Sequence, residues 1–202
     1  MRLSTSFFPL IVTGILLFSY SAPKEPVILN SRNEDVSTLI RIRHHADSLK
    51  RFAAREHYNP SIAFLADMSM PSGNKRFFVY NMMKDSIELM GLVTNGNTLD
   101  NKPVFSNTPG SNCTSLGKYK VGYAYQGTYG LAYKLYGLDE SNSKAFERFV
   151  VLHSHRCVPD EEPQPADICT SWGCPTVSPA FLMKLKTYIE GSKQPILLYI
   201  YD

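Results

Sequence analysis

The sequence lacks a strong excess of charge of either sign. It has 21 Lys and Arg residues against 18 Asp and Glu residues, a formal net charge of +3. Proteins that bind nucleic acids electrostatically present a dense basic surface, so this composition predicts no nucleic-acid partner. A Walker motif, a dinucleotide-binding glycine pattern and a Gly-x-Ser-x-Gly turn are also missing. We therefore expect no nucleotide cofactor.

Cysteine is scarce, with four residues in a chain of 202. Small scaffolds held together by disulfides are much richer in cysteine, and a chain of this length can bury a hydrophobic core without them. A content of 44% hydrophobic and 12% aromatic residues is typical of one globular domain. Each cysteine therefore needs its own explanation.

A hydrophobic run long enough to span a membrane is missing near the N-terminus. The apolar run Phe7–Tyr20 contains proline and glycine and is shorter than the roughly 20 residues that a spanning helix needs. Arg2 precedes it, and Ser19 and Ser21 are small residues at the positions that signal peptidase prefers. These features predict a secretory signal at 1–21, cleaved after Ser21, with no membrane span remaining. An uncleaved anchor is the alternative interpretation.

Beyond the extended leader Ala22–Asn30, apolar residues recur with helical spacing. Ser31 and Glu34 have the spacing of a capping box, so the pattern predicts a helix over 32–57. Four basic residues on its other face are expected to lie in solvent: Arg41, Lys50, Arg51 and Arg55.

Residues 22–58 thus form a leader and helix, and residues 59–202 form one domain. Most of this domain consists of short β-rich runs separated by turn residues. The strand candidates are 61–67, 76–82, 86–93, 117–121, 131–138, 149–155 and 196–201. Two helices are predicted among them, Ser141–Arg148 and Pro179–Glu190. The sequence therefore predicts a mainly β domain with flanking helices.

One stretch of the domain combines a histidine and a cysteine in a way that suits nucleophilic catalysis. His153 ends an apolar strand, and Cys174 follows Gly173 in a turn shortly before a helix. Glycine allows the chain to turn tightly, and amides at the start of a helix favour an anion such as a thiolate. A neutral thiol still needs a base, and an imidazole can serve. Alternation along the strand places His155 on the same face as His153, so this pattern alone leaves the choice of base open.

Other interpretations use the same residues. A zinc site is one, with ligands drawn from His153, His155, Cys157, Cys169 and Cys174. A disulfide between Cys157 and Cys169 is favoured over it, because an exported protein meets an oxidising compartment. Cys113 is then left as a buried free thiol.

The motif resembles that of the bacterial murein L,D-transpeptidase catalytic domain family. The resemblance rests on the apolar strand ending in His153-Ser154 and on the later run Ser171-Trp172-Gly173-Cys174-Pro175. Upstream runs agree with the family as well: Phe105-Ser106-Asn107, Ser115-Leu116-Gly117-Lys118-Tyr119, Tyr129-Gly130, and Ser141-Asn142 with Ala145 and Arg148. The similarity covers about 61–201.

The resemblance implies a fold and roles for individual residues. The fold would be the family's β-sandwich or barrel-like sheet with flanking helices, here including the N-terminal one. Cys174 would be the nucleophile and His153 the base, and Ser154 would orient the imidazole through its backbone carbonyl. Ser171, Trp172 and Gly173 would form the oxyanion and substrate-binding turn. The resemblance thus selects His153 over His155.

The resemblance also implies an activity on peptidoglycan stem peptides. The enzyme would form 3→3 cross-links through a thioester, need no cofactor and no metal, and work as a monomer in the periplasm or cell envelope of a bacterium. Three alternatives remain: an L,D-carboxypeptidase that uses water as acceptor, a zinc-dependent hydrolase, and a secreted wall-binding protein without catalytic activity.

The sequence departs from many members of the family at several positions. Trp172 stands where wider relatives have histidine, and Thr176 stands where they have arginine. Thr94-Asn95-Gly96 replaces an expected Ala-His-Gly run, and two cysteines, Cys157 and Cys169, have no counterpart. These changes leave open which basic group, if any, receives a carboxylate of the substrate.

Overall fold

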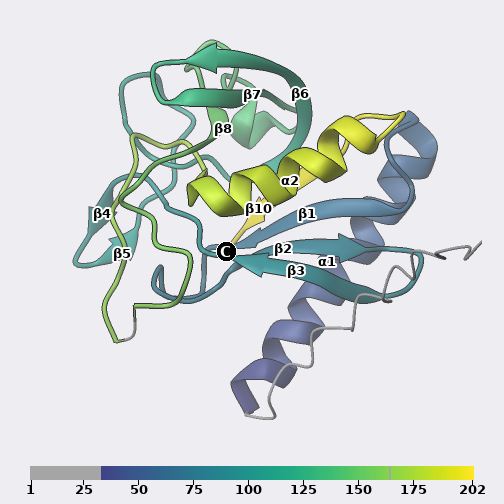
Figure 1. Ribbon diagram of the computed structural model, residues 1–202, viewed down its shortest axis with the longest axis horizontal. Coiled ribbons are helices and arrows are strands. Elements are labelled where there is room, and N and C mark those ends of the chain that lie inside the picture. The colour runs from purple at the N-terminus through teal and green to yellow at the C-terminus, as the bar shows by residue number, and fades with distance from the viewer. Residues whose placement is uncertain (1–32, 164) are drawn as a thin grey trace, which may run out of the picture.

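The computed structural model describes residues 33–163 and 165–202 (Figure 1). The predicted signal sequence, its cleavage site, the leader and the Ser31 end of the capping box lie outside these residues. In chain order, the elements are α1 (Asn33–Glu56), β1 (Ile62–Asp67), β2 (Phe77–Asn81), β3 (Ser86–Gly91), β4 (Thr98–Leu99), β5 (Lys102–Pro103), β6 (Gly117–Gly127), β7 (Gly130–Gly137), the 3-10 helix η1 (Glu140–Asn142), β8 (Val151–Ser154), β9 (Thr176–Val177), α2 (Pro179–Gly191) and β10 (Leu197–Tyr201).

Eight strands form one mixed sheet in the order β3-β2-β1-β10-β6-β7-β8-β9. The pairs β1–β10 and β8–β9 are parallel, and the other neighbours are antiparallel. β10 lies at the centre, although it is the last strand of the chain. The short pair β4–β5 forms a separate hairpin. The predicted mainly β class is confirmed.

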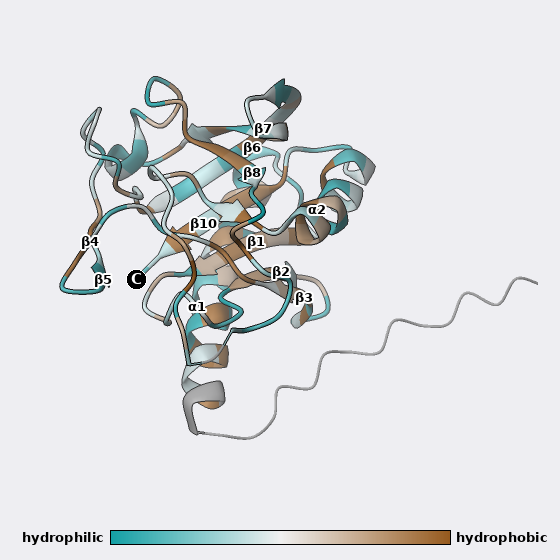
Figure 2. Cartoon of the chain, turned by 60° about the vertical axis from the view of Figure 1, so that its left-hand side comes forward, coloured by the Kyte–Doolittle hydropathy of each residue, from teal (hydrophilic) through white to brown (hydrophobic). Residues whose placement is uncertain are grey.

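The two helices cover opposite faces of the sheet (Figure 1). Successive residues of β1 alternate between two cores: Ala63 and Leu65 pack with α1, whereas Phe64 and Ala66 pack with α2. The α2 core also receives side chains from β6, β7 and β8, so both halves of the sheet close around this helix. Figure 2 shows the hydrophobic (brown) colour concentrated around β1 and β10, at the centre of the sheet.

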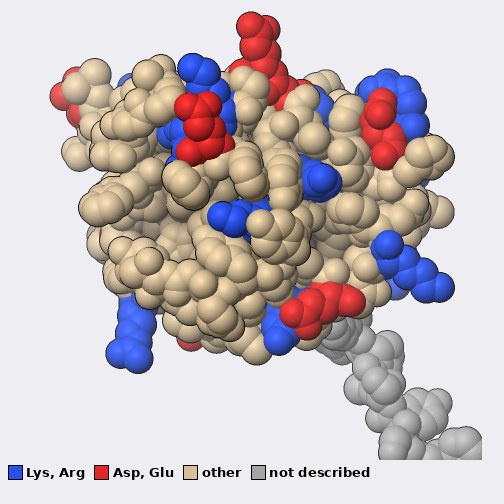
Figure 3. All heavy atoms as spheres, turned by 90° about the horizontal axis from the view of Figure 1, so that it is seen from above, with Lys and Arg blue, Asp and Glu red and all other residues tan. Residues whose placement is uncertain are grey.

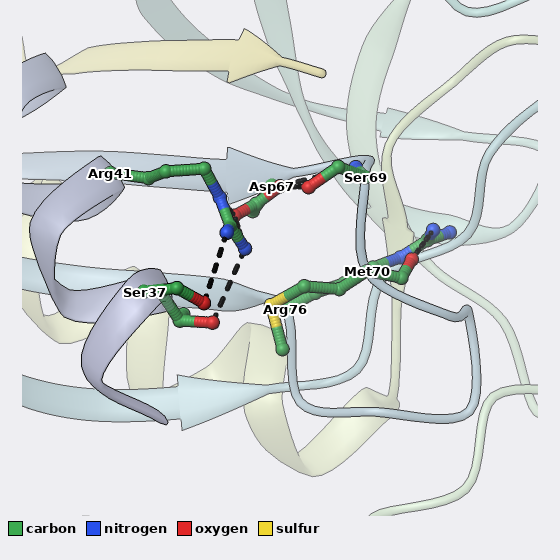
Figure 4. A network of polar contacts seen from close by, with 7 residues as sticks. Ser37, Arg41, Asp67, Ser69, Met70 and Arg76 are labelled. Carbon is green, nitrogen blue, oxygen red and sulfur yellow. Dashed lines mark hydrogen bonds and ion pairs between the residues drawn. The ribbon is translucent and has the colours of Figure 1, made fainter. Parts of the chain in front are cut away.

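An ion pair between a half-buried arginine and a buried carboxylate attaches α1 to the end of β1 (Figure 4). The Asp67 side chain is fully buried, and its Oδ2 lies 2.9 Å from Nη2 of Arg41. Its Oδ1 accepts a hydrogen bond from the amide of Ser69 at 3.1 Å. The expectation that Arg41 lies only in solvent is therefore wrong, because this arginine turns back to neutralise a buried carboxylate.

The helix predicted over 141–148 is also wrong. Only η1 and a series of turns occupy this segment, and Phe149 ends it with φ of 56°. The Asn142 side chain accepts from the amide of Asp139 at 2.9 Å and donates to the carbonyl of Lys118 at 2.8 Å. Such side-chain bonds to nearby and distant backbone compete with the regular bonds of a helix.

Within 33–163 and 165–202, no helix has the length and apolar character needed to cross a bilayer. The face drawn in Figure 3 carries Lys, Arg, Asp and Glu interspersed among uncharged residues. This face agrees with the nearly balanced charge of the sequence.

Candidate functional site

His153 lies on β8, held between β7 and β9. Its Cα partners are Ala132 on one side and Thr176 on the other. Its Nδ1 lies 3.1 Å from the backbone carbonyl of Ser154, and its Nε2 lies 3.0 Å from Oγ1 of Thr176. A carbonyl can only accept, so we assign the proton to Nδ1 and an acceptor lone pair to Nε2. The nitrogen that can take up a proton is therefore the one beside Thr176.

An aromatic side chain covers the imidazole. Tyr129, in the turn between β6 and β7, stacks on His153 with ring centroids 5.3 Å apart. The same tyrosine meets the ring of His155 edge-on at 5.2 Å. His155 is exposed, whereas His153 is nearly buried, so the two predicted candidates for the base have different surroundings.

Hydrogen bonds of Ser171 shape the turn that carries Cys174. Its Oγ accepts from the amide of Gly173 at 3.1 Å and donates to the carbonyl of Cys174 at 2.7 Å. Its amide donates to the carbonyl of Asn95 at 2.8 Å, which attaches the turn to the loop after β3. Within the described residues, the amides of Trp172 and Cys174 have no hydrogen-bond acceptor. Two donors thus remain available in this turn.

The helix expected after the cysteine is α2, which begins at Pro179 as predicted. β9 comes between Cys174 and α2, and Ser178 caps α2 by accepting from the amide of Phe181 at 3.1 Å. The amide of Phe181 in the first turn of α2 therefore has a partner of its own, and the charge near the thiol comes from another residue.

That residue is Arg148, which lies beneath the turn. Its Nη2 donates to the carbonyl of Cys113 at 2.6 Å, and its Nη1 donates to the carbonyl of Ser106 at 2.8 Å. A Cβ added at Gly173 would lie 2.5 Å from the Cys113 carbonyl oxygen and 3.3 Å from Nη2 of Arg148. Glycine, with φ of 99°, therefore lets the turn rest on this arginine and on the segment that it holds.

Burial of the pair favours a thiol and a neutral imidazole in the resting state. Burial raises the pKa of Cys174, while a hydrogen bond from the backbone of Val151 and the charge of Arg148 oppose that rise. Burial lowers the pKa of His153, a hydrogen bond with the Ser154 backbone opposes this, and His155 adds to it. The resting pair is therefore uncharged at neutral pH.

Cys174 and His153 line the same two cavities. One has a volume of about 270 Å³ and is also lined by Thr94, Tyr129, His155, Cys157, Thr170, Ser171, Trp172 and Thr176. The other, of about 170 Å³, lies between Tyr125, Tyr129 and Phe149. The Trp172 side chain is 82% exposed. A substrate can therefore approach the sulfur and the imidazole together from either side.

A disulfide joins Cys157 and Cys169, and Cys157 forms part of the larger cavity wall. The zinc interpretation counts both sulfurs among its five candidate ligands, and this bond removes them as thiolates. Among 33–163 and 165–202, no group of three or more His, Cys, Asp or Glu residues could hold a metal ion. Cys113 is a buried free cysteine.

Comparison with known proteins decides the family. Residues 36–201 match the family model described as the L,D-transpeptidase catalytic domain. The chain belongs to this family. The resemblance drawn from the sequence is thereby confirmed.

Similar solved structures share little sequence with this L,D-transpeptidase domain. They include the helical cell shape determining protein Pgp2 from Campylobacter jejuni, with 11% identity, 70% of this chain and 48% of that chain covered, and a TM-score of 0.46. An L,D-transpeptidase from Xylanimonas cellulosilytica has 16% identity, 75% and 68% coverage, and a TM-score of 0.39. L,D-transpeptidase 1 from Mycobacterium tuberculosis has 12% identity, 69% and 61% coverage, and a TM-score of 0.35. The chain spans about half the length of the first of these, and no curated protein sequence matches it.

Sequence reasoning missed three residues of the site in this L,D-transpeptidase domain. Tyr129 and Arg148 were noted only as parts of matching runs, and Thr176 only as a departure from an arginine. Their contacts depend on which strands become neighbours, and the sequence pattern does not carry that information. An aromatic residue in a tight turn and an arginine just before a buried strand are the signals that were present.

Proposed function

We propose that the protein is a peptidoglycan L,D-transpeptidase that forms 3→3 cross-links through a thioester on Cys174, with His153 as general base and acid. One observation carries the proposal: Cys174 and His153 line the same two cavities, and Nδ1 of His153 is held by the Ser154 carbonyl. This arrangement supplies a nucleophile and an oriented base, which acyl transfer requires. Export to the periplasm or cell envelope and action as a monomer remain parts of the proposal.

In the first half-reaction, Nε2 of His153 takes the proton of the Cys174 thiol. The sulfur bonds to the carbonyl carbon of the third stem residue, and the oxygen of that carbonyl becomes negative. The free amides of Trp172 and Cys174 are the donors best placed to hold this charge, since the Gly173 amide already donates to Ser171. The bond to the fourth residue, D-Ala, then breaks, and its amine leaves with the proton from Nε2.

In the second half-reaction, the side-chain amine of the third residue of another stem attacks the thioester carbonyl. His153 accepts the proton of this amine, the carbon–sulfur bond breaks, and the sulfur recovers a proton. Water in place of the amine gives a carboxylate and makes the enzyme an L,D-carboxypeptidase. Thr176 fits this cycle, because its hydroxyl lies 3.0 Å from Nε2 and 3.3 Å from the Cys174 carbonyl and can turn between them.

Incubation of the protein, lacking the predicted signal 1–21, with purified disaccharide tetrapeptides tests the function. Mass spectrometry is expected to find 3→3 linked dimers together with released D-Ala. Release of D-Ala without dimers would favour the carboxypeptidase, and absence of both products would overturn the proposal. Activity that persists in a chelator is expected, whereas its loss would favour the zinc-dependent hydrolase.

The pH dependence of kcat/KM is expected to show an acid limb below pH 6.5, because His153 must be neutral and burial lowers its pKa. The electrostatic effect of His155 lowers the pKa of His153, so His155→Gln is expected to raise the pKa of His153 and to move this limb toward neutral pH. The exposed His44 on α1 provides a control, since His44→Gln should leave the limb in place. A limb that stays fixed in His155→Gln would contradict the assignment of His153 as the titrating base.

A further inference from the structure

A third cavity, here called the Arg76 cavity, lies next to the turn that carries Cys174 and shares Thr170 with the first cavity. It has a volume of about 450 Å³. Its walls come from the segment after β1, the β4–β5 hairpin and the chain around 167–170. Thr170 lines both this cavity and the one of about 270 Å³ that contains Cys174 and His153. A ligand group can thus sit in the Arg76 cavity while the rest of the same ligand lies at the sulfur.

Arg76 supplies a buried positive charge to this cavity. Its residue is 1% exposed, and its guanidinium donates to the carbonyl of Val93 at 3.0 Å and to that of Met70 at 2.8 Å. Figure 4 shows the side chain running away from the Arg41–Asp67 pair toward the Met70 carbonyl. Its Nη2 also donates to Oδ1 of Asn95 at 2.6 Å. All of these acceptors are neutral.

A buried arginine normally faces a carboxylate or another anion. In the described part of the chain, no Asp or Glu oxygen lies within 4.0 Å of the Arg76 guanidinium. Burial lowers the pKa of Arg76 to about 10, which reflects the cost of keeping this charge away from water, and the charges of Asp167 and Asp67 offset only part of that cost. An anion bound in the cavity would offset that cost.

Two more charged side chains define what kind of anion fits. Lys102 on β5 is exposed and lines the cavity, which adds a second positive charge. Asp167 lines it as well, and its Oδ1 accepts from Oγ of Ser72 at 2.7 Å. Two cations and one carboxylate suit a group that carries a carboxylate and an ammonium on the same carbon.

Asn95 connects the Arg76 cavity to the nucleophile turn. Its side chain accepts from Arg76, and its backbone carbonyl accepts from the amide of Ser171 at 2.8 Å. Ser171 in turn bonds to the carbonyl of Cys174. Hydrogen bonds through Asn95 and Ser171 therefore connect the Arg76 guanidinium to the turn that carries the sulfur.

We propose that the Arg76 cavity binds the free amino-acid end of the third stem residue's side chain, with its carboxylate against Arg76 and Lys102 and its ammonium toward Asp167. This assignment rests on the proposed function for the identity of the peptide. Many relatives carry an arginine at the position of Thr176. In this chain, the arginine that binds a carboxylate would instead be Arg76.

Binding measured without turnover tests the proposal separately from the reaction. The probe is a stem tetrapeptide whose third residue is diaminopimelate, titrated calorimetrically into the Cys174→Ala protein. Converting the carboxylate at the free end of diaminopimelate to a carboxamide is expected to weaken binding about tenfold, because a charge-assisted hydrogen bond is lost. Equal affinity for the two peptides would overturn the proposal, whether or not the enzyme is active.

Two variants assign the effect to the cavity. Arg76→Lys removes the guanidinium, whose Nη1 has one N–H beyond its bond to Met70, and is expected to weaken binding of the carboxylate peptide about tenfold, with little effect on the carboxamide peptide. Because Arg76 is buried, its replacement can also destabilise the fold. Lys102→Glu therefore provides a second variant, on an exposed residue. Lys102→Glu is expected to lower the affinity for the carboxylate peptide about fivefold and the affinity for the carboxamide peptide less than about twofold.

The matched control is Lys193→Glu, the same charge reversal at an exposed lysine away from both cavities. It should leave both affinities unchanged. Equal effects of Lys102→Glu and Lys193→Glu would overturn the assignment, since they would reveal only long-range electrostatics. The peptide has two other carboxylates, on its glutamate and on its C-terminal D-Ala, and each can be amidated in turn. If amidation of one of these, and not of diaminopimelate, makes Lys102→Glu and the parent protein bind equally well, the assignment is also overturned.

Discussion

Replacing Cys174 with alanine is expected to lower the rate of D-Ala release and of cross-linking by about 10⁴-fold or more. No other described side chain near the turn offers a nucleophile of comparable strength, since Cys113 is buried and Cys157 and Cys169 are bonded to each other. His153→Ala should cost nearly as much, because the pair rests as a neutral thiol that needs a base. Rates are measured by chromatography of muropeptides.

The double variant is expected to be no slower than Cys174→Ala alone, because the two residues act as one unit. Cys113→Ser provides a control on the other free cysteine: it keeps the backbone carbonyl that Arg148 holds and should retain activity within about threefold. Activity that survives Cys174→Ala would contradict the thiol mechanism. A loss in Cys113→Ser as large as in Cys174→Ala would show that the assignment rests on the wrong sulfur.

Replacing Gly173 with alanine is expected to reduce activity about 100-fold and to lower the free energy of unfolding by about 2–3 kcal/mol. The residue has φ of 99°, which disfavours any side chain, and its Cβ would lie 2.5 Å from the carbonyl oxygen of Cys113. Arg148 holds that carbonyl, so the turn has to move instead. Cys174 would move with it, away from the geometry that acyl transfer requires.

Gly110 allows the two causes to be separated. It also has positive φ, 76°, but a Cβ there would meet nothing within 4 Å. Gly110→Ala should therefore cost only about 1 kcal/mol of stability and leave the activity near that of the parent. Chemical unfolding and muropeptide kinetics measure both quantities. If the two alanine variants lose equal activity, the contact beneath Gly173 does not position the nucleophile.

Much of the fold could be predicted because its long elements have strong patterns. The apolar spacing over 32–57 and the proline at Pro179 predict α1 and α2 with nearly the observed bounds. The segment 141–148 has an equally helical composition, but Asn142 bonds to the backbone of β6 and prevents a helix. β9 is too short to have a pattern of its own, and it forms because β8 provides an edge beside it.

The candidate site could be predicted in part for a similar reason. A histidine at a strand end and a cysteine after glycine have a local pattern, so His153 and Cys174 could be singled out. The role of Arg148 depends on carbonyls far away in the sequence, at Ser106 and Cys113. The stacking of Tyr129 on His153 depends on the pairing of β7 with β8. Such contacts arise from the topology, which a single sequence does not state.

The central strand of the sheet is the last strand of the domain to leave the ribosome. β10 joins the half that contains β1, β2 and β3 to the half that contains β6, β7 and β8. His153 belongs to the second half. The loop after β3 belongs to the first half, and its Asn95 carbonyl accepts a hydrogen bond from Ser171 in the turn that carries Cys174. The pairing of β8 with β9 brings His153 close to the turn, and β10 joins this half of the sheet to the half whose loop holds the turn. The last strand of the domain therefore fixes the support of the nucleophile relative to the strand that carries the base.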